Sequence, residues 1–166
     1  PKSLRKLLPE ITAFGVDRIV LLRTWRVEKP FLSSSILQPA VYRPLLHEGM
    51  MQGRHTREPH ILIEPLFNPF VQDRLDTYFS SAKHKIVAHP GAKRSLAQLE
   101  IEPTDRVVAV IGPEGGLVAY ELDQLERHGF QTMTMGPAPL RVETACVALM
   151  AQIELLRQRK RRCDEA

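Results

Sequence analysis

The sequence predicts an α/β fold in which a mainly parallel sheet is covered by helices on both sides. Three observations carry this prediction. Short apolar runs alternate along the chain with longer segments whose apolar residues recur at helical spacing. The clearest runs are continuously apolar, as expected of strands that are buried on both faces. No repeat, low-complexity segment or long linker divides the 166 residues, so we expect one domain over residues 1–166.

The N-terminal elements begin the alternation. Apolar residues within Leu4–Ile11 follow the i, i+3, i+4, i+7 pattern of an amphipathic helix, which Gly15 is placed to end. Asp17–Leu22 predicts a buried strand. Thr24–Gln38 contains a proline and a run of serines and is expected to be irregular, and Pro39–Arg54 predicts a second helix.

The later segments continue the alternation of predicted strands and helices. Lys93–Asp105 is polar and connecting, and Arg106–Ile111 is the clearest buried strand in the chain. Gly129 is placed to end the helix that follows. The inner face of the last helix should carry Val142, Cys146, Leu149, Ile153 and Leu156. Strands are expected at Ile61–Ile63, Lys85–Ala88, Arg106–Ile111 and Thr132–Met135, and helices at Val71–Phe79, Val118–Leu125 and Val142–Arg159.

Composition limits the classes of protein. No apolar run approaches the roughly 18 residues of a membrane span, and no secretory signal is visible, so we expect a cytoplasmic protein without a membrane partner. Cys146 and Cys163 form no CxxC or Cys/His cluster, so neither a disulfide nor a metal site is expected. The net charge of +4 suits a polyanionic partner. The basic C-terminus is either a solvated helix end or an RNA phosphate contact, and both readings stay open: Arg157, Arg159, Lys160, Arg161 and Arg162.

Three expected strand ends carry loops rich in Gly and Pro, at His89–Gly91, Gly112–Gly116 and Gly136–Pro139. Ligands bind at the carboxyl ends of parallel strands, and such loops let a ligand approach the backbone. Each loop alone could be an ordinary turn, but the three together favour a nucleoside-type pocket. Dinucleotide, P-loop, serine-esterase and HExxH zinc motifs do not occur.

The segment Leu140–Ala145 follows the third loop and opens the last helix. Arg141 stands between the loop and the helix, where its guanidinium can reach an anionic oxygen or the edge of a base. Glu143 falls in the first helical turn, where the helix dipole favours a carboxylate. A plain helix start is the alternative interpretation.

These motifs resemble the RsmE-type family of the SPOUT superfamily, which methylates N3 of a uridine in small-subunit (16S) ribosomal RNA. The resemblance rests on Ile111–Gly116 and on the Gly-x-x-x-Leu-Arg-x-Glu-Thr-Ala run that starts at Gly136. It extends upstream over further segments: Pro1–Lys6, Gly15–Leu22, Trp25–Lys29, Gln52–Arg54 with Pro59, and His89–Gly91.

The resemblance implies a deep C-terminal trefoil knot, S-adenosylmethionine as cofactor, a homodimer, and ribosomal RNA of the small subunit as partner. It implies Arg141 and Glu143 as the residues nearest the chemistry. RNA contacts are expected at Arg26, Lys29, Gln52 and Arg54. Cofactor contacts are expected at His89, Pro90, Gly91, Ile111, Gly112, Pro113, Glu114, Gly115, Gly116, Met135, Gly136, Pro137 and Leu140.

The chain departs from the family pattern in two places. The N-terminal PUA-like RNA-binding barrel of the family is absent from this chain, and Ala138 and Pro139 stand where the family has Arg and Ile. Three alternatives therefore stay open: a non-catalytic RNA-binding or ribosome-assembly module with a decayed pocket, a knotted methyltransferase acting on a ribose 2′-oxygen, and an adenine-nucleotide-binding regulatory domain.

For the chemistry, we expect Arg141 to stabilise charge that develops on a uracil carbonyl oxygen. Glu143 would orient Arg141 or act as the base, and its place at a helix N-terminus favours the orienting role. Trp25 and Phe31 would stack on RNA or, more in keeping with their type, lie in the core or a dimer interface.

Overall fold

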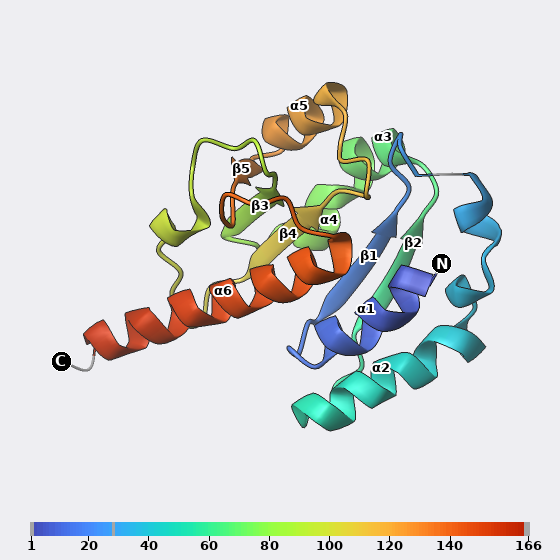
Figure 1. Ribbon diagram of the computed structural model, residues 1–166, viewed down its shortest axis with the longest axis horizontal. Coiled ribbons are helices and arrows are strands. Elements are labelled where there is room, and N and C mark those ends of the chain that lie inside the picture. Colours follow the sequence, from blue (N-terminus) through green and yellow to red (C-terminus); the bar gives the residue numbers. More distant parts are fainter. Residues whose placement is uncertain (1, 28, 165–166) are drawn as a thin grey trace. The chain divides into compact units, whose positions relative to one another are not determined.

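The computed structural model describes residues 2–27 and 29–164, and side chains within residues 3–27 and 30–161 (Figure 1). The chain divides into two compact units, Pro1–Phe67 and Asn68–Ala166. No helix within the described ranges combines the length and apolar character needed to cross a membrane.

The first unit contains two helices and a pair of parallel strands. Strands β1 and β2 pair from Arg18 opposite His60 to Leu22 opposite Glu64. Helices α1 and α2 pack closely because Gly49 has no side chain, and a Cβ there would collide with the carbonyl oxygen of Pro9. The elements are α1 (Lys2–Thr12), β1 (Arg18–Leu22), η1 (Lys29–Ser33), η2 (Ser35–Leu37), α2 (Pro39–Gly53) and β2 (His60–Glu64).

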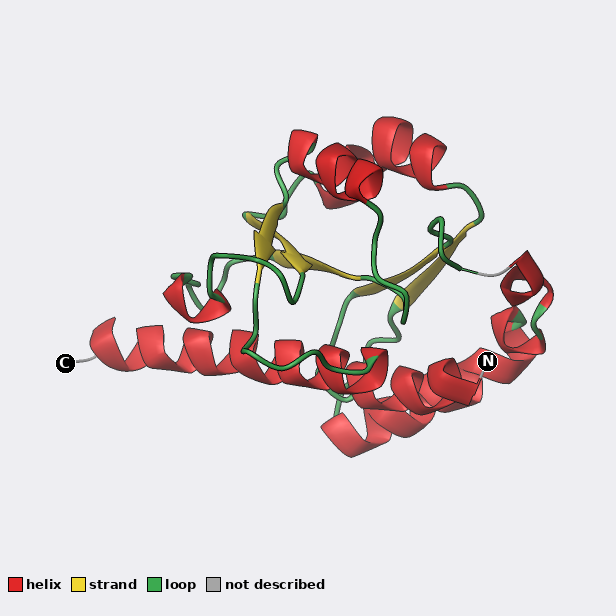
Figure 2. Cartoon of the chain, turned by 45° about the horizontal axis from the view of Figure 1, so that its top comes forward, coloured by secondary structure: helices red, strands yellow, loops and turns green. Residues whose placement is uncertain are grey.

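The second unit is built on a three-stranded parallel sheet with the order β4-β3-β5. Figure 2 shows helices on both sides of the sheet. Ile86 and Val87 are neighbours on the central strand, so they point to opposite faces, and each is 1% exposed. The elements are α3 (Phe67–Pro69), the π-helical turn η3 (Phe70–Arg74), α4 (Leu75–Phe79), β3 (His84–Ala88), η4 (Leu96–Gln98), β4 (Val107–Ile111), α5 (Ala119–Arg127), β5 (Gln131–Met133) and α6 (Val142–Asp164).

Helix α6 lies against one face of this sheet. Its side chains at Leu149, Ile153 and Leu156 join Ile86 and Met133 in a single buried cluster. Ala145 and Cys146 are buried as well, whereas Val142, also expected on the inner face, is half-buried. Helix α6 therefore packs on the sheet through the apolar face that its sequence predicts.

Most predicted elements are confirmed, within a few residues at their ends. Gly15 and Gly129 follow α1 and α5 with φ of 73° and 84°, the left-handed conformation in which glycine costs least. The helix expected from Val71 starts earlier, at Phe67. The α/β class with parallel strands and flanking helices is confirmed.

Three expectations about burial and connectivity were wrong. The described strands pair in two sheets rather than one. The residues of β4 are all half-buried, because this strand lies at the edge of its sheet and β3 takes the centre. In β1, Ile19 is buried while its neighbours are exposed or half-buried. An apolar run thus identifies a strand without fixing its place in the sheet.

Two segments expected to be irregular carry short helices and core residues. The polar connection 93–105 contains η4, whose start is capped by the Ser95 hydroxyl, and it places Leu96 and Ile101 in the buried cluster. The stretch 24–38 contains two 3-10 turns and buries Ile36 and Leu37. Isolated apolar residues among polar ones give little periodic signal, so these contacts are invisible in the pattern.

A polar cluster ties the second unit together at the start of β3. The Asp105 carboxylate accepts hydrogen bonds from Lys83 Nζ (3.0 Å), His84 Nε2 (2.9 Å) and the backbone N–H of Glu102 (2.9 Å). Arg157 of α6 donates to the Asp105 carbonyl oxygen at 2.9 Å. Burial alone would raise the pKa of Asp105, but the bonds from His84, Glu102 and Lys83 outweigh it and lower the pKa to about 2.

This cluster predicts an acid-dependent stability. A carboxylate whose folded-state pKa is lowered stabilises the fold above its unfolded pKa of 3.8, and that stabilisation is lost as the pH falls toward 2. We expect Asp105→Asn to lower the free energy of unfolding at pH 7 and the difference from wild type to shrink between pH 4 and pH 2. Urea denaturation across this range measures it. Asp123→Asn removes an exposed i,i+4 pair with Arg127 and should cost about 0.5 kcal/mol or less. A constant deficit for Asp105→Asn from pH 7 to pH 2 would contradict the assignment.

Candidate functional site

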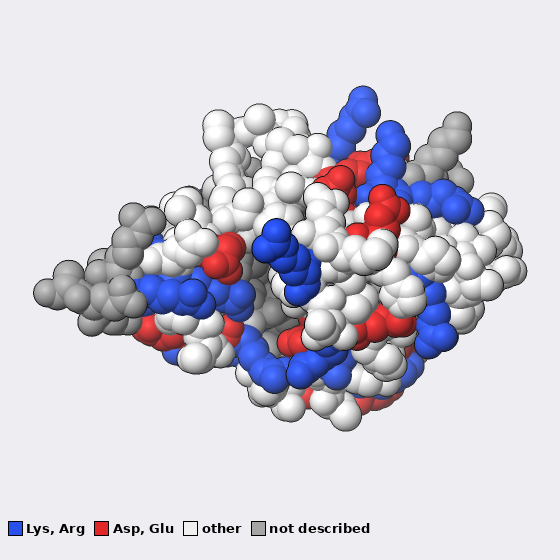
Figure 3. Space-filling model, turned by 90° about the horizontal axis from the view of Figure 1, so that it is seen from below, with Lys and Arg blue, Asp and Glu red and all other residues white. Residues whose placement is uncertain are grey.

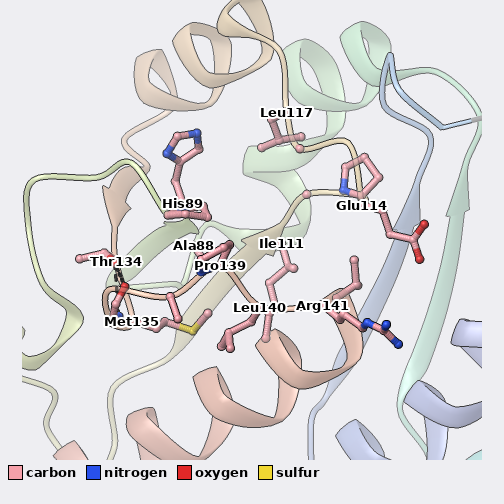
Figure 4. A pocket seen from close by; sticks show the side chains of 18 residues that line it. Ala88, His89, Ile111, Glu114, Leu117, Thr134, Met135, Pro139, Leu140 and Arg141 are labelled. Carbon is pink, nitrogen blue, oxygen red and sulfur yellow. Dashed lines mark hydrogen bonds between the residues drawn. The ribbon is translucent and has the colours of Figure 1, made fainter.

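A pocket of about 410 Å³ opens at the carboxyl ends of β3, β4 and β5, within the second unit (Figure 4). Its volume lies in the range typical of small-ligand sites. Three loops and the first turn of α6 supply its walls. The lining residues are Ala88, His89, Pro90, Ile111, Gly112, Pro113, Glu114, Gly116, Leu117, Thr134, Met135, Gly136, Ala138, Pro139, Leu140, Arg141, Val142 and Ala145.

The first loop turns sharply after β3. The backbone N–H of His89 donates to the Met133 carbonyl oxygen (2.9 Å), which continues the pairing with β5. The N–H of Gly91 then donates to His89 Nδ1 at 3.1 Å, which closes the turn. As predicted, His89 and Pro90 line the pocket; Gly91, also predicted, is outside the lining.

The second loop, residues 112–116, requires its glycines. Gly116 has a φ of 74° and donates its N–H to the Pro113 carbonyl oxygen at 2.7 Å. A Cβ on Gly112 would lie 3.1 Å from the backbone nitrogen of Leu117. The loop therefore folds back tightly on itself, and it brings Leu117 into the wall. Gly115, predicted for the site, is outside the lining, whereas Leu117 had not been predicted.

The third loop is held from inside and from α6. The Thr134 hydroxyl donates to the carbonyl oxygen of Gly136 (2.7 Å) and accepts from its N–H (3.3 Å), as Figure 4 shows. Gln152 of α6 donates to the Met135 carbonyl oxygen at 3.1 Å. Pro137, predicted for the site, is outside the lining, and Ala138 and Pro139 lie within it.

The base of this loop is also pinned to the segment that follows the first loop. The N–H of Thr134 donates to the Arg94 carbonyl oxygen at 2.8 Å, and the Thr134 carbonyl accepts from the N–H of Leu96 at 2.9 Å. Since Leu96 is fully buried, the pairing is anchored in the core. The first and third loops are thereby fixed to each other by backbone bonds.

Three of the described lining residues carry ionisable side chains: His89, Glu114 and Arg141. In Figure 4, Glu114 and Arg141 project at one end of the pocket and His89 at the other. The rest of the wall is mainly apolar or backbone. The pocket is thus suited to an uncharged or cationic ligand body, with both signs of charge available at one end.

Glu143, predicted beside Arg141, is outside the lining. Cys146 lies one helical turn beyond Glu143 and is buried. Burial, and the nearby charge of Glu143, raise the pKa of Cys146 to about 12, so this free cysteine stays a thiol and supplies no nucleophile.

The residues predicted to contact RNA lie in the first unit. Arg26, Gln52 and Arg54 are exposed, and the side chain of Lys29 lies outside the described residues. Arg54 caps α2 with a φ of 56°, which is uncommon for a residue other than glycine. The side chain of Trp25 is 83% exposed, so of the places expected for it the core is excluded, whereas Phe31 is half-buried.

The basic end of α6 is only partly available to a partner. Arg157 binds the Asp105 carbonyl oxygen and Lys160 Nζ lies 3.5 Å from a Glu102 carboxylate oxygen. Arg159 and Arg161 are exposed, and Figure 3 shows basic side chains toward this end of α6. The side chain of Arg162 lies outside the described part. Within that part, no group of His, Cys, Asp and Glu side chains could hold a metal ion.

Comparison with known proteins gives a consistent picture. The family described as "RNA methyltransferase domain" matches residues 1–154. Ribosomal RNA small subunit methyltransferase E 1 of Borreliella burgdorferi is 26% identical over 149 residues, which cover 89% of this chain and 60% of that protein. Ribosomal RNA small subunit methyltransferase E of Treponema pallidum is 26% identical over 155 residues, covering 92% of this chain and 58% of its own length. The chain therefore spans about three fifths of these relatives.

A solved structure shows the same fold. Ribosomal RNA small subunit methyltransferase E of Neisseria gonorrhoeae, crystallised with S-adenosyl methionine, aligns with a TM-score of 0.76 at 22% identity. The alignment covers 94% of this chain and 62% of that one.

The third loop provides a test of the site's construction. Thr134→Val keeps the shape of the side chain but removes both hydrogen bonds to Gly136. We expect a loss of about 1 kcal/mol in unfolding free energy and faster amide hydrogen exchange in residues 134–141. Thr77→Val, at an exposed position of α4, is the matched control. Unchanged exchange in the loop of Thr134→Val would show that the hydroxyl does not hold it.

Proposed function

Because the chain belongs to the RNA methyltransferase domain family, we propose that it transfers a methyl group from S-adenosylmethionine to N3 of a uridine in small-subunit (16S) ribosomal RNA. The observation that carries the proposal is the pocket that three backbone-defined loops form at the carboxyl ends of three parallel strands. Most of its lining residues lie in the segments 89–91, 111–116 and 136–145, which resemble the family's motifs. The names of the relatives support the same reaction.

The pocket fits S-adenosylmethionine by its chemistry. Apolar side chains such as Ile111, Leu117 and Met135 can pack on an adenosine, and the tight loops present backbone groups to a purine edge. Among the described lining residues Arg141 is the one permanent cation, so little is offered to a triphosphate. This favours the cofactor over the adenine nucleotide of the regulatory-domain alternative. When bound, S-adenosylmethionine supplies a methyl group already activated by its sulfonium.

The protein's part in the reaction is alignment and charge stabilisation. The loops would hold the reacting partners in line, which converts an encounter between two molecules into a positioned reaction. Uracil N3 carries a proton, and its removal leaves negative charge shared with the carbonyl oxygens. Arg141 at the pocket end would donate to such an oxygen as the charge develops. Glu143, outside the lining, is left with the orienting role or with none.

The remaining family features belong to the same proposal. A C-terminal trefoil knot is part of this proposal and rests on the resemblance of residues 111–116 and 136–145 to the family's motifs. A homodimer belongs to the same proposal and rests on the family resemblance. Both units would form one methyltransferase domain. Contacts of Arg26, Lys29, Gln52 and Arg54 with RNA, and a cytoplasmic setting, follow from a ribosomal substrate.

A specific observation favours the second candidate, a non-catalytic RNA-binding module: Ala138 and Pro139 in the pocket wall replace the family's Arg and Ile. The Ala138 side chain cannot make the hydrogen bonds of an arginine, as expected of a decayed pocket. The backbone of the loop nevertheless keeps its internal bonds at Thr134 and Gly136. Cofactor binding therefore discriminates the two candidates.

Calorimetric titration with S-adenosylhomocysteine tests the pocket. We expect selective binding at about one site per chain and no comparable heat with ATP, because the wall is apolar and holds a single arginine among its described residues. Binding of both ligands alike would favour a nucleotide-binding domain. If neither binds, the pocket is decayed and the RNA-binding module becomes the better description.

Replacement of the pocket arginine tests the chemistry. We expect Arg141→Ala to lower methyl transfer to small ribosomal subunits by about 100-fold or more, since it removes a donor aimed at developing charge. Tritium transfer from labelled S-adenosylmethionine measures it. Arg127→Ala on α5 removes an exposed arginine of a surface ion pair and should leave turnover unchanged. Equal turnover of Arg141→Ala and wild type would exclude the role given to Arg141.

A further inference from the structure

Two side chains of opposite charge, Glu114 and Arg141, line the same end of the pocket. Glu114 comes from the loop after β4, and Arg141 immediately precedes α6. Both side chains are exposed and both line the pocket (Figure 4), while His89, the third ionisable group of the wall, lies at the opposite end. Backbone hydrogen bonds hold the main chain at both residues. The Gly116 N–H closes the loop beside Glu114 by donating to the Pro113 carbonyl oxygen, and the Arg141 carbonyl oxygen accepts the first helical bond of α6 from Ala145 (2.8 Å).

This pair matches the Watson–Crick edge of uracil. That edge presents an acceptor, a donor and an acceptor: O4, N3–H and O2. A carboxylate accepts from N3–H and a guanidinium donates to a flanking carbonyl oxygen. Cytosine has no proton on N3, so the lone pair of N3 would face the carboxylate without a hydrogen bond. A site built on such pairing rejects the base that cannot complete it.

We propose that Glu114 and Arg141 together recognise the imide edge of the target uracil and that Glu114 is the base that takes the N3 proton. This inference rests on the proposed function and gives Glu114 a role toward the RNA rather than toward the cofactor. It also assigns the base that the position of Glu143, outside the pocket wall, leaves unassigned.

The proposed reaction moves one proton and one methyl group. The N3 proton moves to a Glu114 carboxylate oxygen, and the N3 electron pair forms the new bond to the methyl carbon. The bond between that carbon and sulfur breaks, and its electron pair stays on sulfur, which becomes a neutral thioether. Arg141 stabilises the charge on the uracil carbonyl oxygen in between. Because Glu114 is exposed, it then returns its proton to water.

Glu114→Gln is the decisive variant because glutamine keeps the shape and an acceptor oxygen but takes up no proton. We expect kcat for methyl transfer to small ribosomal subunits to fall about 100-fold or more, with KM for the subunits within about threefold. Affinity for S-adenosylhomocysteine, measured by calorimetry, should stay within about twofold. Glu126→Gln on α5, an exposed glutamate outside the pocket, is the control and should match wild type in all three values.

Two further readouts separate a base from a structural role. The rate of Glu114→Gln should rise steadily with pH, because only uracil that has already lost its N3 proton reacts. Subunits that carry 5-fluorouracil, whose N3 is more acidic, should narrow the gap between Glu114→Gln and wild type at least tenfold. A misfolded or misplaced loop would not be rescued by a more acidic substrate.

The activity of the wild-type protein separates failure of this inference from failure of the proposed function. If wild type neither binds S-adenosylhomocysteine nor transfers methyl groups, the proposed function falls, and this inference with it. If wild type is active and Glu114→Gln retains kcat within threefold, or loses it without rescue by 5-fluorouracil, Glu114 is not the base and this inference alone is overturned. Loss of S-adenosylhomocysteine binding in Glu114→Gln would return Glu114 to the cofactor site and also overturn it.

Discussion

The site depends on one backbone constraint, the pinning of Thr134 between Arg94 and Leu96. These two hydrogen bonds hold the chain just after β5 against the segment that follows the first loop. Leu96 is buried beside Met133 and Leu149, so hydrophobic packing stabilises the same junction. The third loop then leaves this fixed point with its own bonds at Thr134 and Gly136. The first and third loops of the pocket are thus held in place from the core.

The backbone and the side chains contribute differently to the pocket. Glycines and internal turn bonds shape the part suited to a nucleoside, where close approach matters more than charge. The acidic Glu114 and the basic Arg141 stand at one end, where both are exposed, and His89 lies at the other. A cationic sulfonium compound and a polyanionic RNA can thus meet in one place without a strong charge in the nucleoside-binding wall.

The sequence predicts the three loops because the carboxyl ends of parallel strands share one edge of a sheet. It does not predict which residue of each loop faces inward. Gly91, Gly115 and Pro137 lie in the right loops but outside the lining, because neighbours in a tight turn point in different directions. Four further lining residues carry plain apolar side chains, so only the structure shows their place in the pocket: Ala88, Leu117, Val142 and Ala145. The edge position of β4 escaped prediction for a similar reason, since apolar character alone does not order strands.

The prolines of the third loop add to this rigidity. Pro139 lies in the pocket wall, and Pro137 lies two residues before it; each fixes its φ and narrows the conformations open to the free chain. A loop that is already ordered loses less entropy when a ligand binds. The family's arginine at position 138 would bring a second cation into the wall, beside the nucleoside-binding surface. With Ala138 there, Arg141 is the one arginine or lysine among the described lining residues, so under the proposed function the loop would hold its ligand by backbone preorganisation rather than by charge.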